Sequence, residues 1–376
     1  MESCNTKSSL DLPLESLSLQ PFLQSLHKEQ WQEVRLGEVV EMNNGKARPK
    51  NYGDHPIYGG NGILGYGNQY NCDSETIIVG RVGAYCGCVY YEKQPIWVSD
   101  NAIIVKAKSE NNIKFLYYVL KSMKLNDYAL GSSHPLLTQN LLNTLQVEIP
   151  KDITTQQKIA EILSSFDDKI DLLHRQNKTL ESLALTLFRH YFIDNPNRSE
   201  WELGKLGDYI EIFDNKRVPL SKLQRDKMKT GNLYPYYGAA NIMDYVNDFI
   251  FNGEYILMGE DGSVETEDGY PILQFASGKF WVNNHAHIFK AKQPYNDFFI
   301  LNFLKSTNIS HIVTGAVQPK INQENLKSIP FPIFSQQLVR GFIETTNVCF
   351  DKINQNKKQI QNLQAMRDML LKAIFA

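Results

Sequence analysis

The chain has 376 residues, of which 42% are hydrophobic and 21% charged, and its formal net charge is −2 at pH 7. This length allows two domains with cores of their own, and the near-neutral charge leaves only local cation patches to support nucleic-acid binding. No apolar run approaches a membrane span, and the start of the chain lacks the pattern of a secretory signal. The cysteines lack paired zinc-ribbon spacing, so we expect a reduced, cytoplasmic protein without a membrane segment.

The first 30 residues form a leader rich in serine and leucine, to which we assign no structure. Its apolar residues can form an amphipathic face that Pro13 and Pro21 interrupt, so the leader is either disordered or docked on the rest of the chain. Residues 31–152 then show short apolar runs typical of strands, at 77–79, 88–91, 102–105 and 146–149, and a short helix at 115–121. This segment is predicted to be a first domain.

A long helix is predicted over residues 153–194. Apolar residues recur there at alternating spacings of four and three, a 3.5-residue repeat typical of a helix that lies against another helix. Thr154 and Gln157 form a predicted capping box at its start. The stripe consists of Ile159, Leu163, Phe166, Ile170, Leu173, Asn177, Leu180, Ala184, Leu187 and Tyr191.

The second half of the chain repeats the first. The Trp-x4-Leu-Gly motif at Trp31 returns at Trp201, and Asp168-Lys-Ile returns as Asp351-Lys-Ile. This tandem duplication gives a second domain over 201–334 and a second long helix over 335–376. The expected α+β fold is two similar α/β domains joined by two long helices, with pseudo-two-fold symmetry.

The two helices are predicted to form an antiparallel coiled coil in one register. Each seam contains one asparagine near its middle, Asn177 and Asn356, and a buried amide is costly without a hydrogen-bond partner. Antiparallel pairing sets the two amides opposite each other and places the two domains at opposite ends of the rod. The same register gives the pairs Ile159–Ile374, Leu163–Leu370, Ile170–Leu363, Leu173–Ile360, Leu180–Ile353, Ala184–Cys349 and Tyr191–Phe342, and the awkward pair Phe166–Arg367, where the arginine is expected to reach solvent.

One motif imitates a nucleotide-binding fingerprint. Residues 60–65, Gly-Asn-Gly-Ile-Leu-Gly, spell the GxGxxG pattern of dinucleotide-binding folds. The second copy has Ala239, Asn241 and Asp244 at the glycine positions, which favours turn glycines over a phosphate site. A Walker A sequence is absent, which disfavours an ATPase.

Two further clusters have plain structural explanations. Cys72, Cys86 and Cys88 with His55 form only a weak candidate zinc set, because Cys-Gly-Cys alternates like a strand and a second cysteine pair is missing. An acidic cluster in the second copy stands where the first has Arg81, so loop variation explains it better than a shared metal site; it consists of Glu260, Asp261, Glu265, Glu267 and Asp268. His285 and His287 have no evident partners, and we find no catalytic constellation.

Basic segments follow the Leu-Gly strand at the same place in both copies. The first contains Lys46, Arg48 and Lys50, and the second contains Lys216, Arg217, Lys222, Arg225, Lys227 and Lys229. Either segment alone is most simply a solvated loop, but recurrence with changed sequence favours contacts with DNA phosphates and bases. Arg81 is a further candidate for reading a base, and its counterpart Glu260 can accept from a cytosine amino group.

Taken together, these motifs make the chain similar to the specificity subunit of type I restriction–modification systems from Trp31 onward. The resemblance is carried by the two Trp…Leu-Gly starts, the two Phe-Asp…Lys-Ile seams, and the Gln-Gln pairs at 156–157 and 336–337. Two loops complete it, residues 131–139 (Gly-Ser-Ser-His-Pro-Leu-Leu-Thr-Gln) and 315–323 (Gly-Ala-Val-Gln-Pro-Lys-Ile-Asn-Gln). Each motif is weak alone, but their order occurs twice.

The resemblance implies two target-recognition domains with mixed, irregular sheets, each reading one half of a bipartite double-stranded DNA site. The helices would set the spacing and recruit two modification subunits, which carry S-adenosylmethionine and methylate adenine. Restriction subunits, where present, would add ATP- and Mg-dependent translocation and cleavage, and this chain itself would hold no cofactor or metal and catalyse nothing. The two loops are then expected near DNA, with His134, Thr138, Gln318, Lys320 and Asn322 as contacts.

Two other functions remain as alternatives. A stand-alone DNA methyltransferase or nuclease needs an Asn/Asp-Pro-Pro-Tyr/Phe motif or paired metal-binding carboxylates, and the sequence shows neither. A purely structural coiled-coil scaffold does not explain why the two domains share a framework but differ in their loops. Binding of S-adenosylmethionine by the purified chain would discriminate the first alternative.

Overall fold

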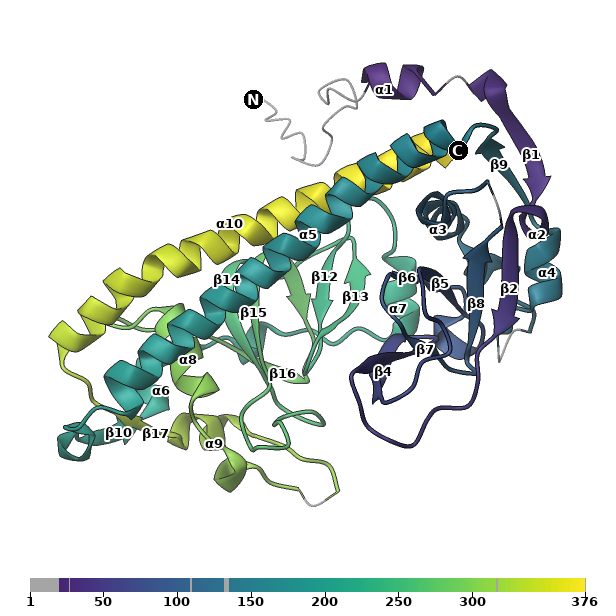
Figure 1. The fold of residues 1–376 in the computed structure, drawn as a ribbon. Helices are drawn as coiled ribbons and strands as arrows, with labels where there is room; N and C mark the ends of the chain where they lie inside the picture. The colour runs from purple at the N-terminus through teal and green to yellow at the C-terminus, as the bar shows by residue number, and fades with distance from the viewer. Residues whose placement is uncertain (1–19, 27, 109, 132–134, 316, 376) are drawn as a thin grey trace. The chain divides into compact units, whose positions relative to one another are not determined.

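The computed structural model describes residues 20–26, 28–108, 110–131, 135–315 and 317–375 (Figure 1). They form two compact units: unit 1 contains the residues up to Leu173 and those from Lys358 onward, and unit 2 is His174–Lys357. Each unit is therefore a domain completed by part of both long helices. Among the described residues, no helix is long and apolar enough to cross a membrane.

Unit 1 is built on two small sheets and one additional strand pair. Its strands are β1 (Trp31–Arg35), β2 (Val40–Asn44), β3 (His55–Gly59), β4 (Gly62–Gly67), β5 (Thr76–Gly80), β6 (Val89–Glu92), β7 (Trp97–Val98), β8 (Ala102–Ala107) and β9 (Gln146–Pro150). Its short helices are α1 (Gln20–Gln24), α2 (Leu36–Val39), α3 (Ile113–Ser122) and α4 (Gln139–Thr144). The sheet orders are β2-β8-β5-β6 and β4-β3-β7, and β1 pairs with β9. The three-stranded sheet is mixed, as the resemblance implies, because β3 pairs antiparallel with β4 and parallel with β7. The four-stranded sheet is antiparallel throughout.

Strand β5 shows why this sequence forms a layered core. Its residues are all buried, and alternate side chains of a strand point to opposite faces. Ile77 and Val79 pack in the large core that contains Phe115 of α3, whereas Ile78 packs with Tyr58 and neighbouring residues in a second cluster. The apolar run is continuous because both faces of the strand are covered.

Part of the leader is docked on unit 1. Leu26 is buried in the main core, and Phe22 and Leu23 pack against it. The indole N–H of Trp31 donates to the carbonyl of Leu26 at 3.0 Å. The docked alternative therefore holds for residues 20–26, and the rest of the predicted amphipathic face lies outside the described residues.

Unit 2 repeats this plan with one larger sheet. Its strands are β10 (Leu203–Lys205), β11 (Ile210–Ile212), β12 (Tyr234–Tyr237), β13 (Ile242–Val246), β14 (Phe251–Gly259), β15 (Leu273–Val282), β16 (Ala286–Ala291) and β17 (Pro330–Pro332). Its short helices are α6 (Leu206–Tyr209), α7 (Lys222–Lys227), α8 (Asp297–Lys305) and α9 (Gln323–Ser328). The six-stranded order is β11-β16-β14-β15-β12-β13, and β10 pairs with β17. The long β15 pairs with both β14 and β12. In unit 1 two separate strands make the equivalent pairs, β6 with β5 and β7 with β3, so the two sheets of unit 1 correspond to the single sheet of unit 2.

The duplication extends to backbone irregularities. The hairpins β3–β4 and β12–β13 have the same register, and both shift it at the same step, between Ile57 and Tyr58 and between Tyr236 and Tyr237. The GxGxxG stretch lies in the first hairpin, where Gly62 has a φ of 79°. These glycines are turn and strand residues, as the comparison of the two copies predicts, because a phosphate fingerprint would open a helix.

The first long helix, α5 (Ile153–Phe188), begins earlier than the predicted capping box. The carboxylate of Asp152 accepts from the N–H of Thr155 at 2.8 Å, so Asp152 caps the helix. Hydrogen bonds from the backbone N–H and side chain of Thr155 lower the pKa of Asp152. The capping box of Thr154 and Gln157 is therefore wrong.

The second long helix, α10 (Gln336–Phe375), is capped by Ser335, whose hydroxyl accepts from the N–H of Leu338 at 3.3 Å. Counting four residues from each cap, the buried Gln156 of α5 corresponds to the buried Val339 of α10. The two Gln-Gln pairs are thus not equivalent positions. Gln156 instead ties the helix start to the domain, since its amide binds the N–H of Asn112 and the carbonyl of Pro150.

Within unit 2 the helices are antiparallel in the predicted register (Figure 1). The amide Nδ2 of Asn356 donates to Oδ1 of Asn177 at 2.9 Å, and both residues are buried. Leu180 and Ile353 belong to one core cluster. Oδ1 of Asn356 is buried and has no hydrogen-bond partner among the described residues.

Within unit 1 the same antiparallel pairing continues. Ile170, Leu173, Ile360 and Leu363 form one apolar cluster, and Ile159, Leu163, Leu370 and Ile374 lie in the main core. Arg367 does not reach into solvent as predicted. Its guanidinium donates to the carboxylate of Asp167 at 2.6 Å. The same carboxylate accepts from the hydroxyl of Tyr118, so Arg367 pairs with the residue next to Phe166 in the sequence.

The seam changes near the end of α5. After Ala184 the buried side chains are Phe188 and Phe192, while the predicted Leu187 and Tyr191 are only half-buried. A π-helical turn over Arg189–Ile193 ends the helix. Its wider hydrogen-bond spacing departs from the 3.5-residue repeat, and the ring of Phe342 contacts Phe188 and Phe192 instead of the predicted Tyr191.

One aromatic contact recurs in both units. In unit 1 the ring of Phe375, at the end of α10, lies 6.4 Å from Trp31 and 5.7 Å from Phe115. In unit 2 the ring of Phe192, after the end of α5, lies 5.0 Å from Phe299 and 4.8 Å from Phe334. We call these two sets of rings the aromatic sockets. Each domain thus receives the end of a long helix in the same way.

Candidate nucleic-acid interface

In unit 1, several loops converge on Arg81, directly after β5. The backbone N–H of Arg81 donates to the carbonyl of Asn101 at 3.1 Å, and its carbonyl accepts from the N–H of Leu137 at 2.9 Å. The tip of the β3–β4 hairpin also lies here, since the Cα of Gly80 and the carbonyl of Val82 face Gly60. The structure therefore joins Arg81 to the loop of residues 131–139, two segments that the sequence proposes separately.

The same junction exists in unit 2 around Glu260, directly after β14. Its N–H donates to the carbonyl of His285 at 2.8 Å, and its carbonyl accepts from the N–H of Ile321 at 2.8 Å. The hairpin tip is again adjacent, because the carbonyl of Ala239 faces Gly259. Positions 81 and 260 are thus structural equivalents, as the sequence comparison assumes.

Both basic segments are anchored beside this junction by a tryptophan. The indole of Trp97 donates to the carbonyl of Lys46 at 3.2 Å, and that of Trp281 donates to the carbonyl of Val218 at 2.6 Å. Lys46, Arg48 and Lys50 are exposed and form no ion pair within the part of the chain that the structure describes. Their charges remain available to a phosphate backbone.

In the second basic segment the cations divide into two groups. Lys216, Lys222 and Lys227 are exposed. Arg225 is bound internally, since its Nε donates to Asp244 at 3.0 Å and its NH1 donates to the carbonyl of Leu220. Asp244 also forms an ion pair with Lys229. Arg225 and Lys229 thus bind the basic segment to strand β13, and their charges are already partly neutralised by Asp244.

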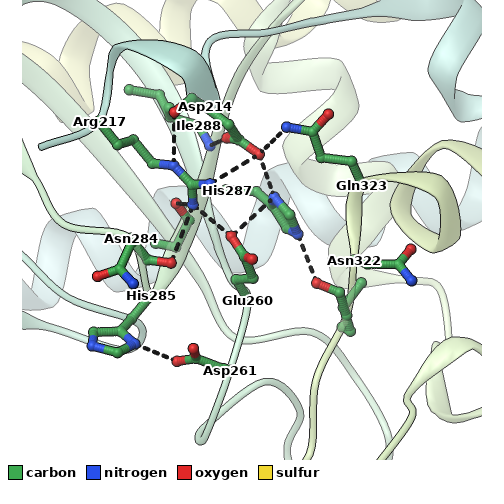
Figure 2. Close-up of polar contacts among 12 residues, drawn as sticks. Asp214, Arg217, Glu260, Asp261, Asn284, His285, His287, Ile288, Asn322 and Gln323 are labelled. Carbon is green, nitrogen blue, oxygen red and sulfur yellow. Dashed lines mark hydrogen bonds and ion pairs between the residues drawn. The ribbon is translucent and has the colours of Figure 1, made fainter. Parts of the chain in front are cut away.

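Arg217 is the centre of a buried network (Figure 2). Its NH1 donates to Oε2 of Glu260 at 2.6 Å and to the carbonyl of Ala286 at 2.7 Å, and its side chain is only 12% exposed. The position of Arg217 is taken in unit 1 by Gly45, whose N–H donates to the carbonyl of Ala102, the residue equivalent to Ala286. A direct phosphate contact by Arg217, as the sequence predicts, would require breaking these bonds.

Asp214 and His287 complete the network. His287 is fully buried, with Nδ1 2.6 Å from Oδ2 of Asp214 and Nε2 2.8 Å from the carbonyl of Ile321. Burial raises the pKa of Asp214, but hydrogen bonds from His287 and the N–H of Ile288, with the charge of Arg217, outweigh it and hold this pKa below its ordinary value. Both ring nitrogens of His287 therefore face an acceptor, a carboxylate oxygen at Nδ1 and a carbonyl oxygen at Nε2.

This network fixes the second loop near the interface. His287 holds Ile321, and the amide of Gln323 donates to Asp214 at 2.7 Å. In unit 1 the equivalent Gln139 has its own partners, since its amide donates to the carbonyl of Met42 at 3.2 Å and accepts from the N–H of Asn44 at 2.9 Å. The prediction that His285 and His287 have no evident partners is therefore wrong. His287 binds Asp214 and Ile321, and His285 binds Asp261.

Asp214, Glu260 and His287 also have ligand atoms within 4.8 Å of one another, the spacing of a cation site. The donor atoms are already engaged, because Glu260 binds Arg217 and Asp214 accepts from His287 and Gln323. The guanidinium supplies the positive charge there. Among the described residues, Cys72, Cys86, Cys88 and His55 do not form such a group.

The remaining predicted contacts have mixed environments. Thr138 and Asn322 are helix N-caps whose side chains accept from the N–H groups of Leu141 and Asn325, so part of their hydrogen-bonding capacity is structural. Gln318 and Lys320 are exposed, and Lys320 lies 3.6 Å from Glu260. His134 lies outside the described residues.

The link between Asp214 and His287 is not evident from the sequence. The two residues are far apart in the chain, and their counterparts in unit 1, Asn44 and Ile103, carry no charge. A comparison of the two copies for positions that gain charge together would have found the pair.

Comparison with known proteins assigns the family. The model of the type I restriction modification DNA specificity domain matches residues 28–182 and again 198–362. The chain therefore belongs to the family of type I restriction–modification specificity subunits. It is a DNA-recognition subunit and not an enzyme.

Relatives from other organisms agree with this assignment. A putative specificity subunit of Haemophilus influenzae is 39% identical over 135 residues, which are 36% of this chain and 34% of that relative. A specificity subunit of Methanocaldococcus jannaschii is 26% identical over 325 residues, 76% of this chain and 73% of the relative. The crystal structure of an S subunit from M. genitalium shares the fold, with a TM-score of 0.56 at 19% identity over 92% of this chain and 96% of that one.

Proposed function

We propose that each unit reads one half of a bipartite double-stranded DNA site through the junction around Arg81 or Glu260 and the adjoining basic segment. The observation that carries the proposal is the recurrence of one assembly with different side chains. The tryptophan-anchored basic segment, the hairpin tip and the described part of the loop, residues 135–139 or 317–323, meet at the same end of both domains. A shared framework with divergent tips is what reading two different half-sites requires.

The exposed cations supply affinity, and the buried groups supply position. Lys46, Arg48 and Lys50 in unit 1 and Lys216, Lys222 and Lys227 in unit 2 are exposed and suited to neutralising phosphates. The exposed Lys320 adds a further cation in unit 2, and the exposed amide of Gln318 can donate hydrogen bonds beside it. The Arg217 network holds the second loop, so that exposed cations surround a hydrogen-bonded centre.

The partners follow from the family and the two seams. We infer that the long helices recruit two modification subunits, which carry S-adenosylmethionine and methylate adenine, and restriction subunits that use ATP and Mg²⁺ where a system has them. The chain would work in the cytoplasm, where its DNA is. The relatives are named as specificity subunits, which supports this arrangement.

The salt dependence of DNA binding tests the phosphate contacts. Replacing Lys46, Arg48 and Lys50 together by alanine is expected to lower the slope of log K against log salt by about 0.9 for each lost contact. A matched control replaces Lys158, Lys169 and Lys178, three exposed lysines of α5, and changes the net charge equally.

The measurement is fluorescence anisotropy of a labelled duplex carrying the recognised site, titrated at several salt concentrations. The proposal requires a flatter slope in the loop variant and an unchanged slope in the α5 control. An equal change in both variants would show only the effect of net charge, and an unchanged slope in the loop variant would refute the contacts.

A further inference from the structure

Position 81 differs from position 260 in the balance of its charge. Glu260 is bound by Arg217 at 2.6 Å, lies 3.6 Å from both Lys320 and His287, and is 15% exposed. Arg81 forms no ion pair and no side-chain hydrogen bond in the portion of the chain described by the structure, and its Nε is buried without a partner. One domain thus neutralises its junction internally, and the other leaves a cation there.

The residues around Arg81 explain why its charge is uncompensated. Each group that surrounds Glu260 has an uncharged counterpart in unit 1. Strand register and backbone hydrogen bonds equate Asp214 with Asn44, Arg217 with Gly45, His287 with Ile103 and Lys320 with Leu136. A buried donor without a partner costs free energy. In the protein without DNA, no group of the described residues offsets this cost for Arg81.

The backbone of Arg81 is also firmly placed. Its N–H binds Asn101, its carbonyl accepts from Leu137 and from the thiol of Cys86, and three different segments therefore fix it. Nε is buried while the residue as a whole is partly exposed, so the terminal nitrogens are the groups that we take to meet a ligand. The planar fork of a guanidinium suits a planar pair of acceptors, whereas the exposed Lys46, Arg48 and Lys50 suit phosphates.

The planar pair of acceptors on DNA is the major-groove edge of guanine, formed by O6 and N7. We propose that Arg81 reads a guanine in the half-site bound by unit 1, and that position 260 makes no such contact in the other half-site. The inference rests on the proposed function, because it assigns one base to a domain that must first bind a half-site. It makes Arg81 a specificity-determining residue.

The first test reads the target sequence itself. The full chain, wild type or Arg81→Ala, is produced in cells with its modification subunits, and the methylated adenines of the genome are mapped. The variant is expected to lose discrimination about 5- to 150-fold at one G·C pair in one half-site, with the other half-site unchanged. Arg48→Ala is the matched control, and it should lower methylation at all sites alike without altering the motif.

The second test uses the wild-type chain and modified DNA, so it remains valid if Arg81→Ala folds poorly. Wild-type chain is titrated with duplexes in which single guanines are replaced by 7-deazaguanine, which lacks the N7 acceptor. Binding should weaken at one guanine, and Arg81→Lys, which keeps the charge but not the fork, should lose that sensitivity. Either result supports the proposal.

Three results would overturn it. They are an unchanged motif in Arg81→Ala, a uniform loss at every sequence as for a phosphate contact, and no guanine at which the wild type responds to 7-deazaguanine. Failure of the proposed function is distinguishable, because the wild-type complex would then mark no bipartite sequence at all.

Discussion

The buried pair Asn177–Asn356 gives an asymmetric prediction for stability. Asn356 is fully buried and Asn177 is 7% exposed. Asn356 donates to Asn177, while its own Oδ1 has no partner among the described residues. Removing Asn177 therefore leaves the Asn356 amide with only a long hydrogen bond of 3.5 Å to Oε1 of Gln176, whereas removing Asn356 also removes an oxygen that was already unsatisfied.

The magnitudes follow from the cost of unpaired polar groups. Asn177→Val is expected to lower the free energy of unfolding by about 1–3 kcal/mol, the usual cost of a buried orphan group. Asn356→Val should cost less, about 0–1 kcal/mol, because a lost hydrogen bond of about 1 kcal/mol is offset by relief of the unpaired oxygen. The double variant should be close to wild type, since replacing both partners by apolar groups is nearly neutral.

Urea unfolding of the four proteins, followed by helical circular dichroism under one set of conditions, measures the cycle. The expected coupling between the two positions is about 1–4 kcal/mol in magnitude, because the two single variants together lose about that much and the double variant loses almost nothing. A greater loss for Asn356→Val than for Asn177→Val would refute the reasoning. So would a double variant as unstable as the sum of the single ones.

Three further outcomes are expected from the carboxylates. Asp152→Ala should destabilise the chain by about 0.5–2 kcal/mol through loss of the α5 cap, whereas Thr154→Ala in the rejected capping box should be near neutral in the same unfolding assay. Because the pKa of Asp214 is lowered in the folded protein, its ionised form stabilises the fold above the ordinary pKa of about 4, and this stabilisation is lost as pH falls through the lower folded value. Asp214→Asn should therefore be less stable than wild type at neutral pH, and the difference should disappear in acid. Burial raises the pKa of Asp297 despite its bond from the N–H of Ala291, so the opposite sign applies: its contribution is fully present below about 4 and lost as pH rises through the folded value, and Asp297→Asn should raise Tm at pH 7 but not at pH 4.

The long-range plan of the chain was predictable because it rests on periodicity and repetition. The 3.5-residue stripe gives the two helices, and one asparagine in each seam is enough to select the antiparallel register that joins Asn177 to Asn356. The duplication identifies equivalent positions such as 81 and 260 without any knowledge of the sheet.

The details that failed depend on local competition that a pattern does not contain. A carboxylate at Asp152 competes with the hydroxyl of Thr154 for the same backbone groups, and the stronger acceptor begins the helix earlier. The buried face moves by one residue already at Phe188, four residues after Ala184, and the π-helical turn follows it. At the site, Arg217 looks like any basic loop residue until the fold brings Glu260 to it, because these two residues are 43 positions apart in the chain.

The aromatic sockets have a consequence for how such chains diversify. The socket of the first domain, Trp31 and Phe115, receives Phe375 from the far end of the chain, and that of the second receives Phe192. A recombination event that exchanges residues 31–152 for a foreign segment can therefore replace all the loops that we propose to face DNA in unit 1 at once. The exchanged segment must keep the groups that contact the helices, namely the two rings that accept Phe375, the hydroxyl that binds Asp167 and the groups that bind Gln156, so new target sequences can arise by cassette exchange while the helices stay unchanged.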